Sequence, residues 1–226
     1  MTSGMLVLND SGKYIIDENN QQQYFVGKAT YVNAYNYISG GSPPYYTNAI
    51  FSIVSPSVPL VFVRMSSGYA AVQSIYDKGT YWQIALSIYL PVDLELYCFA
   101  KAEDATPSGT TGMKVFDSSG ATIYDSRLDS LLLKGTGTQS HAATVAHGVS
   151  SLSKPAAMLR SLSFANAHTF EYGIEVSYLY LPIFKIDATN ISGGWVYAGK
   201  ASSGYPATSF TYPDITVPII DGADYD

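Results

Sequence analysis

The chain contains 226 residues, of which 47% are hydrophobic and 13% are charged, and its formal net charge is −6. This length suits one large all-β domain or two domains of about 100 residues each, and the hydrophobic share is too high for a disordered chain. Clusters of Lys and Arg, with which nucleic-acid-binding proteins neutralise phosphates, do not occur, so we expect no nucleic-acid partner.

The first predicted element is a β-hairpin over residues 4–17, and its sequence recurs 108 positions later over residues 112–125. Gly, Met, Val, Ser, Gly, Ile and Asp match at identical offsets. Each copy predicts an alternating strand, a tight turn closed by Ser-Gly and a second alternating strand that ends at Asp. The repeat therefore indicates a duplicated β-unit rather than a catalytic site.

In both hairpin turns, Asn or Asp is expected to accept hydrogen bonds from nearby backbone N–H groups, and Gly is expected to take the left-handed conformation. The turn residues are Asn9, Ser11 and Gly12 in the first copy and Asp117, Ser119 and Gly120 in the second. Calcium loops are the alternative, but such sites need six or more oxygen ligands. Turn chemistry is therefore the interpretation that we adopt.

Strand patterns dominate the rest of the chain. β-branched and aromatic residues, partly alternating with polar ones, occupy the segments 61–65, 81–89, 94–99, 170–178, 184–187 and 195–198. Such alternation predicts an all-β fold, an antiparallel β-sandwich with one buried face on each strand. Residues 151–167 are the best candidate for a short helix, although their Ser content is equally compatible with a strand.

The repeat divides the chain into two tandem β-modules, residues 1–105 and residues 106–226. One continuous sandwich with two similar hairpins is the alternative. The tail over residues 214–226 alternates Ile and Val around Pro218, which predicts an edge strand or an extended arm that docks on a neighbouring subunit. An ordinary terminal strand with a solvated acidic end is the simpler interpretation of the same residues.

Residues able to carry out chemistry are sparse. Cys98 is the single cysteine, which excludes an intramolecular disulfide, and its apolar surroundings predict a buried structural thiol. His141 and His147 could share a strand face, but no further ligands complete a zinc set. Asp93 and Glu95 could form a glycosidase-like carboxylate pair or simply the solvent face of a strand. We therefore assign no catalytic, cofactor-binding or metal-binding residue and expect no enzyme activity.

The low charge means that other residues must cover the surface, since ordinary soluble proteins contain roughly 25% charged residues. The chain has 20 Tyr and 19 Gly, a composition that is typical of protein-binding surfaces, of subunits covered by neighbours, and also of β-rich proteins in general. Loops that contain Tyr45, Tyr46 and Tyr205 could stack aromatic rings on a sugar or a receptor.

The repeated hairpin, together with residues 59–63, resembles a hairpin found in small virion proteins of tailed bacteriophages. Such proteins are typically encoded among the tail-tip, baseplate and tail-fibre genes of siphophages. In them the motif follows the initiator Met and occurs again inside the chain, as residues 4–17 and 112–126 do here.

The resemblance implies a β-sandwich structural subunit of the phage tail, without cofactors or catalytic residues. Its expected partners are copies of itself in a symmetric oligomer and other virion tail proteins. A receptor- or carbohydrate-binding module at the tail tip is the alternative, and a hydrolase of host surface polymers is a third possibility. No signal peptide and no apolar run of roughly 20 residues is visible, so we expect synthesis in a cytoplasm and no membrane insertion. The resemblance implies that this cytoplasm is that of the phage host and that the final location is the virion.

Overall fold

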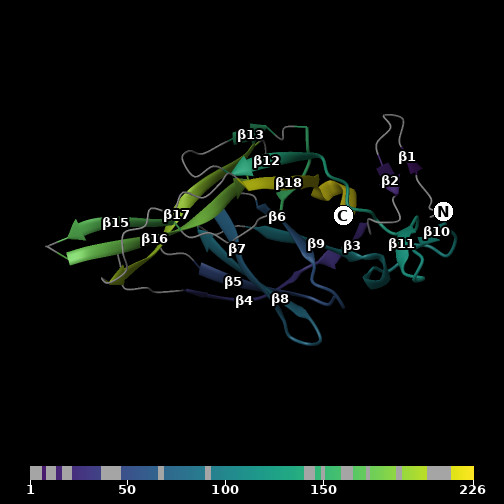
Figure 1. Ribbon diagram of the computed structural model, residues 1–226, viewed down its shortest axis with the longest axis horizontal. Helices are drawn as coiled ribbons and strands as arrows, with labels where there is room; N and C mark the ends of the chain where they lie inside the picture. Colours follow the sequence, from purple (N-terminus) through teal and green to yellow (C-terminus); the bar gives the residue numbers. More distant parts are fainter. Residues whose placement is uncertain are drawn as a thin grey trace.

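Two large antiparallel sheets pack face to face and form the body of the molecule (Figure 1). The computed structural model describes residues 7–8, 14–16, 22–36, 47–65, 69–89, 93–139, 146–148, 151–158, 165–171, 174–186, 190–202 and 215–226. In the described residues, every strand pair of the two sheets is antiparallel. The prediction of an all-β antiparallel sandwich is confirmed.

The first sheet has six strands, in the spatial order β12 (Gly135–Gln139), β18 (Ile215–Asp221), β14 (Pro155–Ala157), β6 (Leu60–Met65), β9 (Leu94–Lys101) and β3 (Gln23–Lys28). The second has eight, in the order β13 (Ala146–Gly148), β17 (Asn190–Ser202), β16 (Ile174–Ile186), β7 (Tyr69–Asp77), β8 (Trp82–Tyr89), β5 (Thr47–Ile53) and β4 (Thr30–Asn36), with β15 (Ala165–Glu171) paired to β16.

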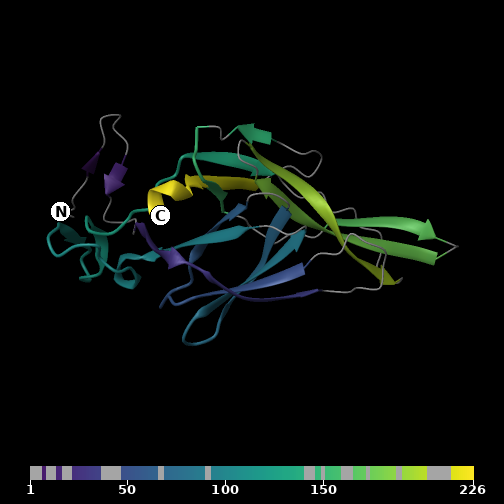
Figure 2. The same cartoon turned by 180° about the vertical axis from the view of Figure 1, so that it is seen from behind.

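Four short strands and two 3₁₀ helices complete the described elements. The strands form two hairpins, β1 (Val7–Leu8) with β2 (Tyr14–Ile16) and β10 (Lys114–Phe116) with β11 (Thr122–Asp125). The helices are η1 (Ala102–Asp104) and η2 (Gly222–Tyr225). Both hairpins lie at one end of the sandwich, and the ribbon of β15, β16 and β17 extends from the other end, as Figures 1 and 2 show.

The main core lies between the two sheets. The eight-stranded sheet contributes buried side chains from β5, β7 and β8, and the six-stranded sheet contributes buried side chains from β6, β9, β14 and β18. The members are Ala49, Phe51, Ala70, Val72, Ile84 and Leu86 on one side, and Val61, Val63, Met65, Leu96, Cys98, Ala157, Val217 and Ile219 on the other. Alternate residues of each strand therefore face this core, as period-two patterns require.

A second buried cluster, rich in aromatic residues, covers the opposite face of the six-stranded sheet. Phe62, Tyr97 and Phe99 project from β6 and β9, and Tyr225 of η2 packs against them. The rings of Phe99 and Tyr225 meet nearly edge to face, with centroids 4.9 Å apart, a favourable aromatic geometry. Because both faces of this sheet are covered, β6 and β9 are buried almost continuously instead of at every second residue.

Both sheets take strands from either side of residue 105. In the six-stranded sheet, β14 and β18 lie beside β6 and β9, and in the eight-stranded sheet β16 joins β7 through Phe184 opposite Ala70. The two halves of the chain thus build one shared core. The division into residues 1–105 and 106–226 does not coincide with two separately packed sheets.

The tail over residues 214–226 forms a strand, as its simpler interpretation predicts, but the predicted edge position, docking arm and solvated acidic end are wrong. β18 is an interior strand between β12 and β14, neither an edge nor an arm. Pro218 is tolerated there because it lies opposite the point where β14 stops. Its carbonyl accepts the N–H of Met158 at 3.0 Å, just past the end of β14. The N–H that proline lacks would point to this same side. The acidic end is held in place, since Tyr225 is buried and Asp226 forms ion pairs.

Two further sequence predictions need correction. The candidate helix over residues 151–167 is not formed in its described part, which contains β14 and the start of β15. The predicted strand over residues 170–178 is divided between β15 and β16, with Glu171 opposite Ile174. Only Gly173 marks this reversal in the sequence, and a single glycine is a weak turn signal.

The lone cysteine provides the first test of the core. Cys98 is fully buried, and burial raises the pKa of its thiol to about 12. In the folded protein at pH 8, a thiol reagent such as DTNB should therefore leave it unmodified. The same reagent should modify one thiol per chain once guanidinium chloride unfolds the protein. Rapid modification without denaturant would contradict the buried position.

A second test concerns the fit of η2 against the sheet. A Cβ atom added at Gly222 would lie 2.4 Å from Cζ of the fully buried Tyr97. Gly222→Ala should therefore lower the free energy of unfolding by about 1–3 kcal/mol, as overpacked cores do. Gly109→Ala, where the added Cβ meets open space, should change it by less than about 0.5 kcal/mol. Urea unfolding of both variants measures the difference.

Candidate functional site

The two repeated hairpins share their strand register as well as their sequence. In each, the pairing shifts by one residue between the first strand's valine and the residue that follows it. The equivalent pairs are Val7–Ile16 with Val115–Tyr124, and Leu8–Tyr14 with Phe116–Thr122. The sequence repeat is therefore also a structural repeat, down to the position of its β-bulge.

The second hairpin turn is organised by one carboxylate. Asp117 Oδ1 accepts hydrogen bonds from the backbone N–H of Ser119 at 2.8 Å, from the Ser119 hydroxyl at 2.7 Å and from the N–H of Ala121 at 2.9 Å. Gly120 has a φ of 89°, in the left-handed region. These bonds lower the pKa of Asp117. The equivalent residues of the first copy, Asn9, Ser11 and Gly12, lie outside the described residues.

The second hairpin is anchored to the sandwich through Asp125. Its N–H donates to the Tyr24 hydroxyl at 2.9 Å, and its carboxylate accepts from Nε and Nη2 of Arg127 at 2.8 and 2.5 Å. This bidentate contact holds the pKa of Asp125 well below its usual range. The first copy has Asn19 where the second has Arg127, so this ion pair is not repeated.

One end of the eight-stranded sheet exposes several large hydrophobic side chains. The register places the start of β4, the end of β5, the start of β8 and the end of β7 side by side, because Ile53 pairs with Trp82 and Trp82 with Asp77. We call the exposed side chains at these strand ends the hydrophobic end. They are Tyr31 (56% exposed), Val32 (53%), Val54 (75%), Tyr76 (53%) and Tyr81 (37%).

Local contacts hold parts of the hydrophobic end in place. The Trp82 indole donates to the Ser55 carbonyl at 2.8 Å and so ties down the residues after β5. The Tyr31 ring meets the Phe51 ring edge to face at 5.6 Å, and Lys78 Nζ lies 5.7 Å from the Tyr76 ring centre. A surface that is already ordered loses less entropy when it binds a partner. Of the four strands at this end, the sequence patterns predicted only β8, as the segment 81–89, and they did not show which aromatic residues remain exposed.

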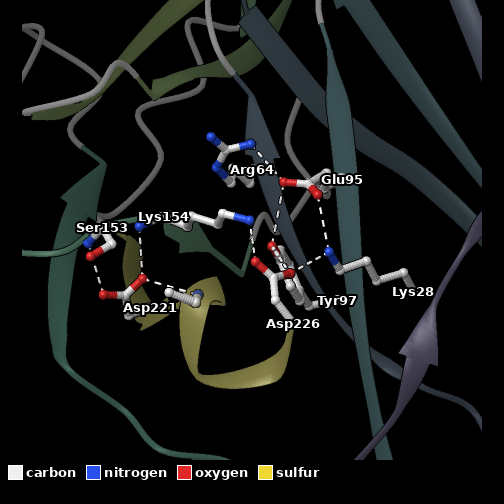
Figure 3. Close-up of polar contacts among 9 residues, drawn as sticks. Lys28, Arg64, Glu95, Tyr97, Ser153, Lys154, Asp221 and Asp226 are labelled. Atoms are coloured by element: carbon white, nitrogen blue, oxygen red, sulfur yellow. Dashed lines mark hydrogen bonds and ion pairs between the residues drawn. The ribbon is translucent and has the colours of Figure 1, made fainter.

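A cluster of charged side chains surrounds Tyr97 where η2 meets the six-stranded sheet (Figure 3). Lys28 Nζ contacts Glu95 at 3.0 Å and also Asp226, and it lies 4.9 Å from the Tyr97 ring centre. The Tyr97 hydroxyl is 3.4 Å from both Glu95 Oε2 and Asp226 Oδ1. Arg64 pairs with Glu95 at 2.6 Å. Strands β3, β6 and β9 therefore meet the end of η2 at this cluster.

One further ion pair and three hydrogen bonds fasten the same segment. Lys154 pairs with Asp226. The Asp221 carboxylate accepts the backbone N–H groups of Ser153, Lys154 and Ala223 at 2.8, 2.7 and 3.1 Å, as Figure 3 shows for the labelled partners. Together these contacts cap η2 and fix it to the residues that lead into β14.

The electrostatics of the cluster keep its carboxylates ionised. Hydrogen bonds from Lys154 and Lys28 lower the pKa of Asp226 to about 2. Burial works to raise the pKa of Glu95, but Lys28 and Arg64 outweigh it, so the pKa is lowered. Burial raises the pKa of Tyr97 to about 12, and the Asp226 carboxylate raises that of Lys28.

This arrangement suits a structural fastening better than acid–base catalysis. A general acid needs a carboxyl group that keeps its proton near neutral pH, and both Glu95 and Asp226 have lowered pKa values instead. Of the predicted carboxylate pair, Asp93 is exposed and Glu95 is bound in the cluster. The sequence alternation found Glu95 but could not show that Asp226, 131 positions later, lies beside it.

The other sequence candidates are only partly described. Tyr45, Tyr46, Tyr205 and His141 lie outside the described residues. The backbone of His147 belongs to β13, opposite Ile191. In the described part of the chain, no group of three His, Cys, Asp or Glu residues could hold a metal ion, and no helix is long and apolar enough to cross a membrane.

Comparisons of the chain with protein-family models, with curated proteins and with solved structures give no match.

The charged cluster yields a pH-dependent test. The pKa of Asp226 falls from an ordinary 3.8 to about 2 on folding, so its contribution to stability is present above about pH 4 and is lost as the pH falls through 2. Asp226→Asn should lower the free energy of unfolding at pH 7 by about 1 kcal/mol, or Tm by roughly 2–4 °C.

The difference between Asp226→Asn and the unchanged protein should shrink toward zero near pH 2, in thermal unfolding followed by circular dichroism. Asp93→Asn, at an exposed position, is the matched control and should change stability by less than about 0.5 kcal/mol. A difference that stays constant from pH 7 to pH 2 would show that the Asp226 carboxylate does not act through its charge.

Proposed function

We propose that this protein is a structural subunit of a bacteriophage tail, at the tail tip, the baseplate or a tail fibre, and that it assembles with copies of itself into a symmetric oligomer. The link to tailed phages rests on the resemblance of residues 4–17, 112–126 and 59–63 to hairpins of such virion proteins. The self-assembly rests on the surface of the sandwich.

The hydrophobic end is the single observation that carries the proposal of assembly. Monomeric soluble proteins expose scattered hydrophobic side chains, but adjacent ones on neighbouring strands are typical of interfaces. Here Tyr31, Val54, Tyr76 and Tyr81 lie at the same end of four adjoining strands, with Tyr31 on the core side of the sheet beside Phe51 and Tyr76 on the opposite side from Ile75. Tyr is also enriched in the cores of protein interfaces, where charged residues are depleted.

The repeated hairpins support a scaffold role. Both copies have the same register and lie together at one end of the molecule (Figures 1 and 2). The turn of the described copy uses its carboxylate for backbone hydrogen bonds. Because this carboxylate is occupied by hydrogen bonds within the turn, the hairpin is better suited to be a rigid support than a reactive loop.

A receptor- or carbohydrate-binding module at the tail tip is the second candidate. The observation that favours it is the pair of exposed rings at the tip of the β7–β8 hairpin, Tyr76 and Tyr81, because exposed aromatic rings can stack on sugars. A hydrolase receives less support, since the carboxylates of the charged cluster are held ionised by neighbouring cations.

Assembly and location are tested separately. Size-exclusion chromatography with multi-angle light scattering should show one discrete oligomer over a wide concentration range, and a strict monomer at high concentration would contradict assembly. Immunogold labelling of purified virions should place the protein on the tail. Detection in the infected-cell lysate but not in the particles would contradict a virion role, and binding of the isolated protein to host cells would favour the second candidate.

A further inference from the structure

Strand β4 is an unusually bare sheet edge. It is the last strand of the eight-stranded sheet, and its residues Thr30 to Ala34 are exposed. Natural proteins protect such edges with charged residues, prolines, bulges or a covering segment, because free backbone groups recruit other strands. The sequence Thr-Tyr-Val-Asn-Ala-Tyr-Asn contains neither charge nor proline, and a register shift at Val32 is its one protective feature.

The far edge of the other sheet shows the contrast. Beside β3, residues 129–131 run along the strand, with Phe25 N–H donating to the Asp129 carbonyl and Leu131 N–H donating to the Gln23 carbonyl, both at 2.8 Å. In the part of the chain that the structure describes, no segment makes equivalent bonds to the free side of β4. Among the described residues, one sheet edge is thus covered and the other is open.

The sequence of β4 is almost symmetric about Asn33, although the bulge at Val32 has no counterpart at Ala34. If two copies of the strand pair antiparallel around an axis at Asn33, each residue meets the one equally far on the other side. The opposed positions are then Asn33 with Asn33, Val32 with Ala34, Tyr31 with Tyr35, and Thr30 with Asn36. Apolar positions meet apolar ones and polar positions meet polar ones, and aromatic cross-strand pairs stabilise sheets.

The absence of charge on β4 makes it a suitable contact between two copies of an acidic chain. The chain carries a net charge of −6, so two copies repel each other over most approaches. An uncharged strand allows close contact without opposing like charges, which destabilise cross-strand pairs. A two-fold axis also fits the isologous interfaces by which most dimers form.

We propose that β4 pairs with β4 of a second copy, antiparallel and around a two-fold axis at Asn33, so that the two eight-stranded sheets join into one. Tyr31 and Val32 of the hydrophobic end lie within this interface. The inference rests on the proposed self-assembly, for which it names the surface and the register.

Cysteine cross-linking tests the register. Asn33→Cys should form an intermolecular disulfide on mild oxidation, because the residue faces its own copy. Val32→Cys and Ala34→Cys should cross-link poorly alone but efficiently when the two variants are mixed, since each faces the other. The native Cys98 is buried and should therefore form no intermolecular disulfide in this assay. Equal cross-linking by Val32→Cys alone and by Asn33→Cys would overturn the register.

A charge-swap experiment tests the pairing without new cysteines. Asn33→Lys and Asn33→Asp should each weaken self-association about tenfold, and mixing the two variants should restore it, because opposite charges then face each other. Thr110→Lys, at an exposed position away from β4, is the control and should have no effect. Circular dichroism confirms that each variant folds.

The outcomes separate this inference from the proposed function. An oligomer that forms but is insensitive to charge at residue 33 and does not cross-link through Asn33→Cys would refute β4 pairing and leave self-assembly intact. A chain that is monomeric at high concentration would refute both. Restoration of association by the mixed Lys and Asp variants is the result that supports the pairing.

Discussion

Coverage of the six-stranded sheet on both faces is the constraint on which the rest of the structure depends. One face packs against the eight-stranded sheet, and the other packs against η2 and the aromatic cluster around Phe99. Each face buries large side chains, which is the main favourable term in folding. The sheet is therefore an internal layer, and both the hairpins and the hydrophobic end are positioned relative to it.

The charged cluster around Tyr97 closes the outer layer. Lysines from β3 and from the residues before β14 converge on Asp226, and Glu95 lies beside them. Individually, partly exposed ion pairs contribute little. Here these ion pairs fix the position of η2 on the sheet, so that Gly222 lies directly against the Tyr97 ring.

Local patterns predicted much of the fold and little of the surface. The apolar segments 61–65, 81–89 and 94–99 became β6, β8 and β9 because they are long, bounded by turn residues and rich in strand formers. The tail was misjudged because Pro218 usually marks an edge, and only the three-dimensional order of strands shows that β14 ends beside it. Likewise, Lys28, Glu95 and Asp226 come together from positions that no spacing rule connects.

The interior position of β18 has a consequence for biosynthesis. Strands β12 and β14 both pair with β18, yet β18 is the last described strand to leave the ribosome. Until residues 215–221 emerge, the two earlier strands lack their shared neighbour, and the aromatic face of β6 and β9 lacks its cover from η2. Pairings between distant segments are slow to form, and exposed edges promote aggregation. Until β18 and η2 form, the nascent chain therefore exposes the facing edges of β12 and β14 and the aromatic side chains of β6 and β9.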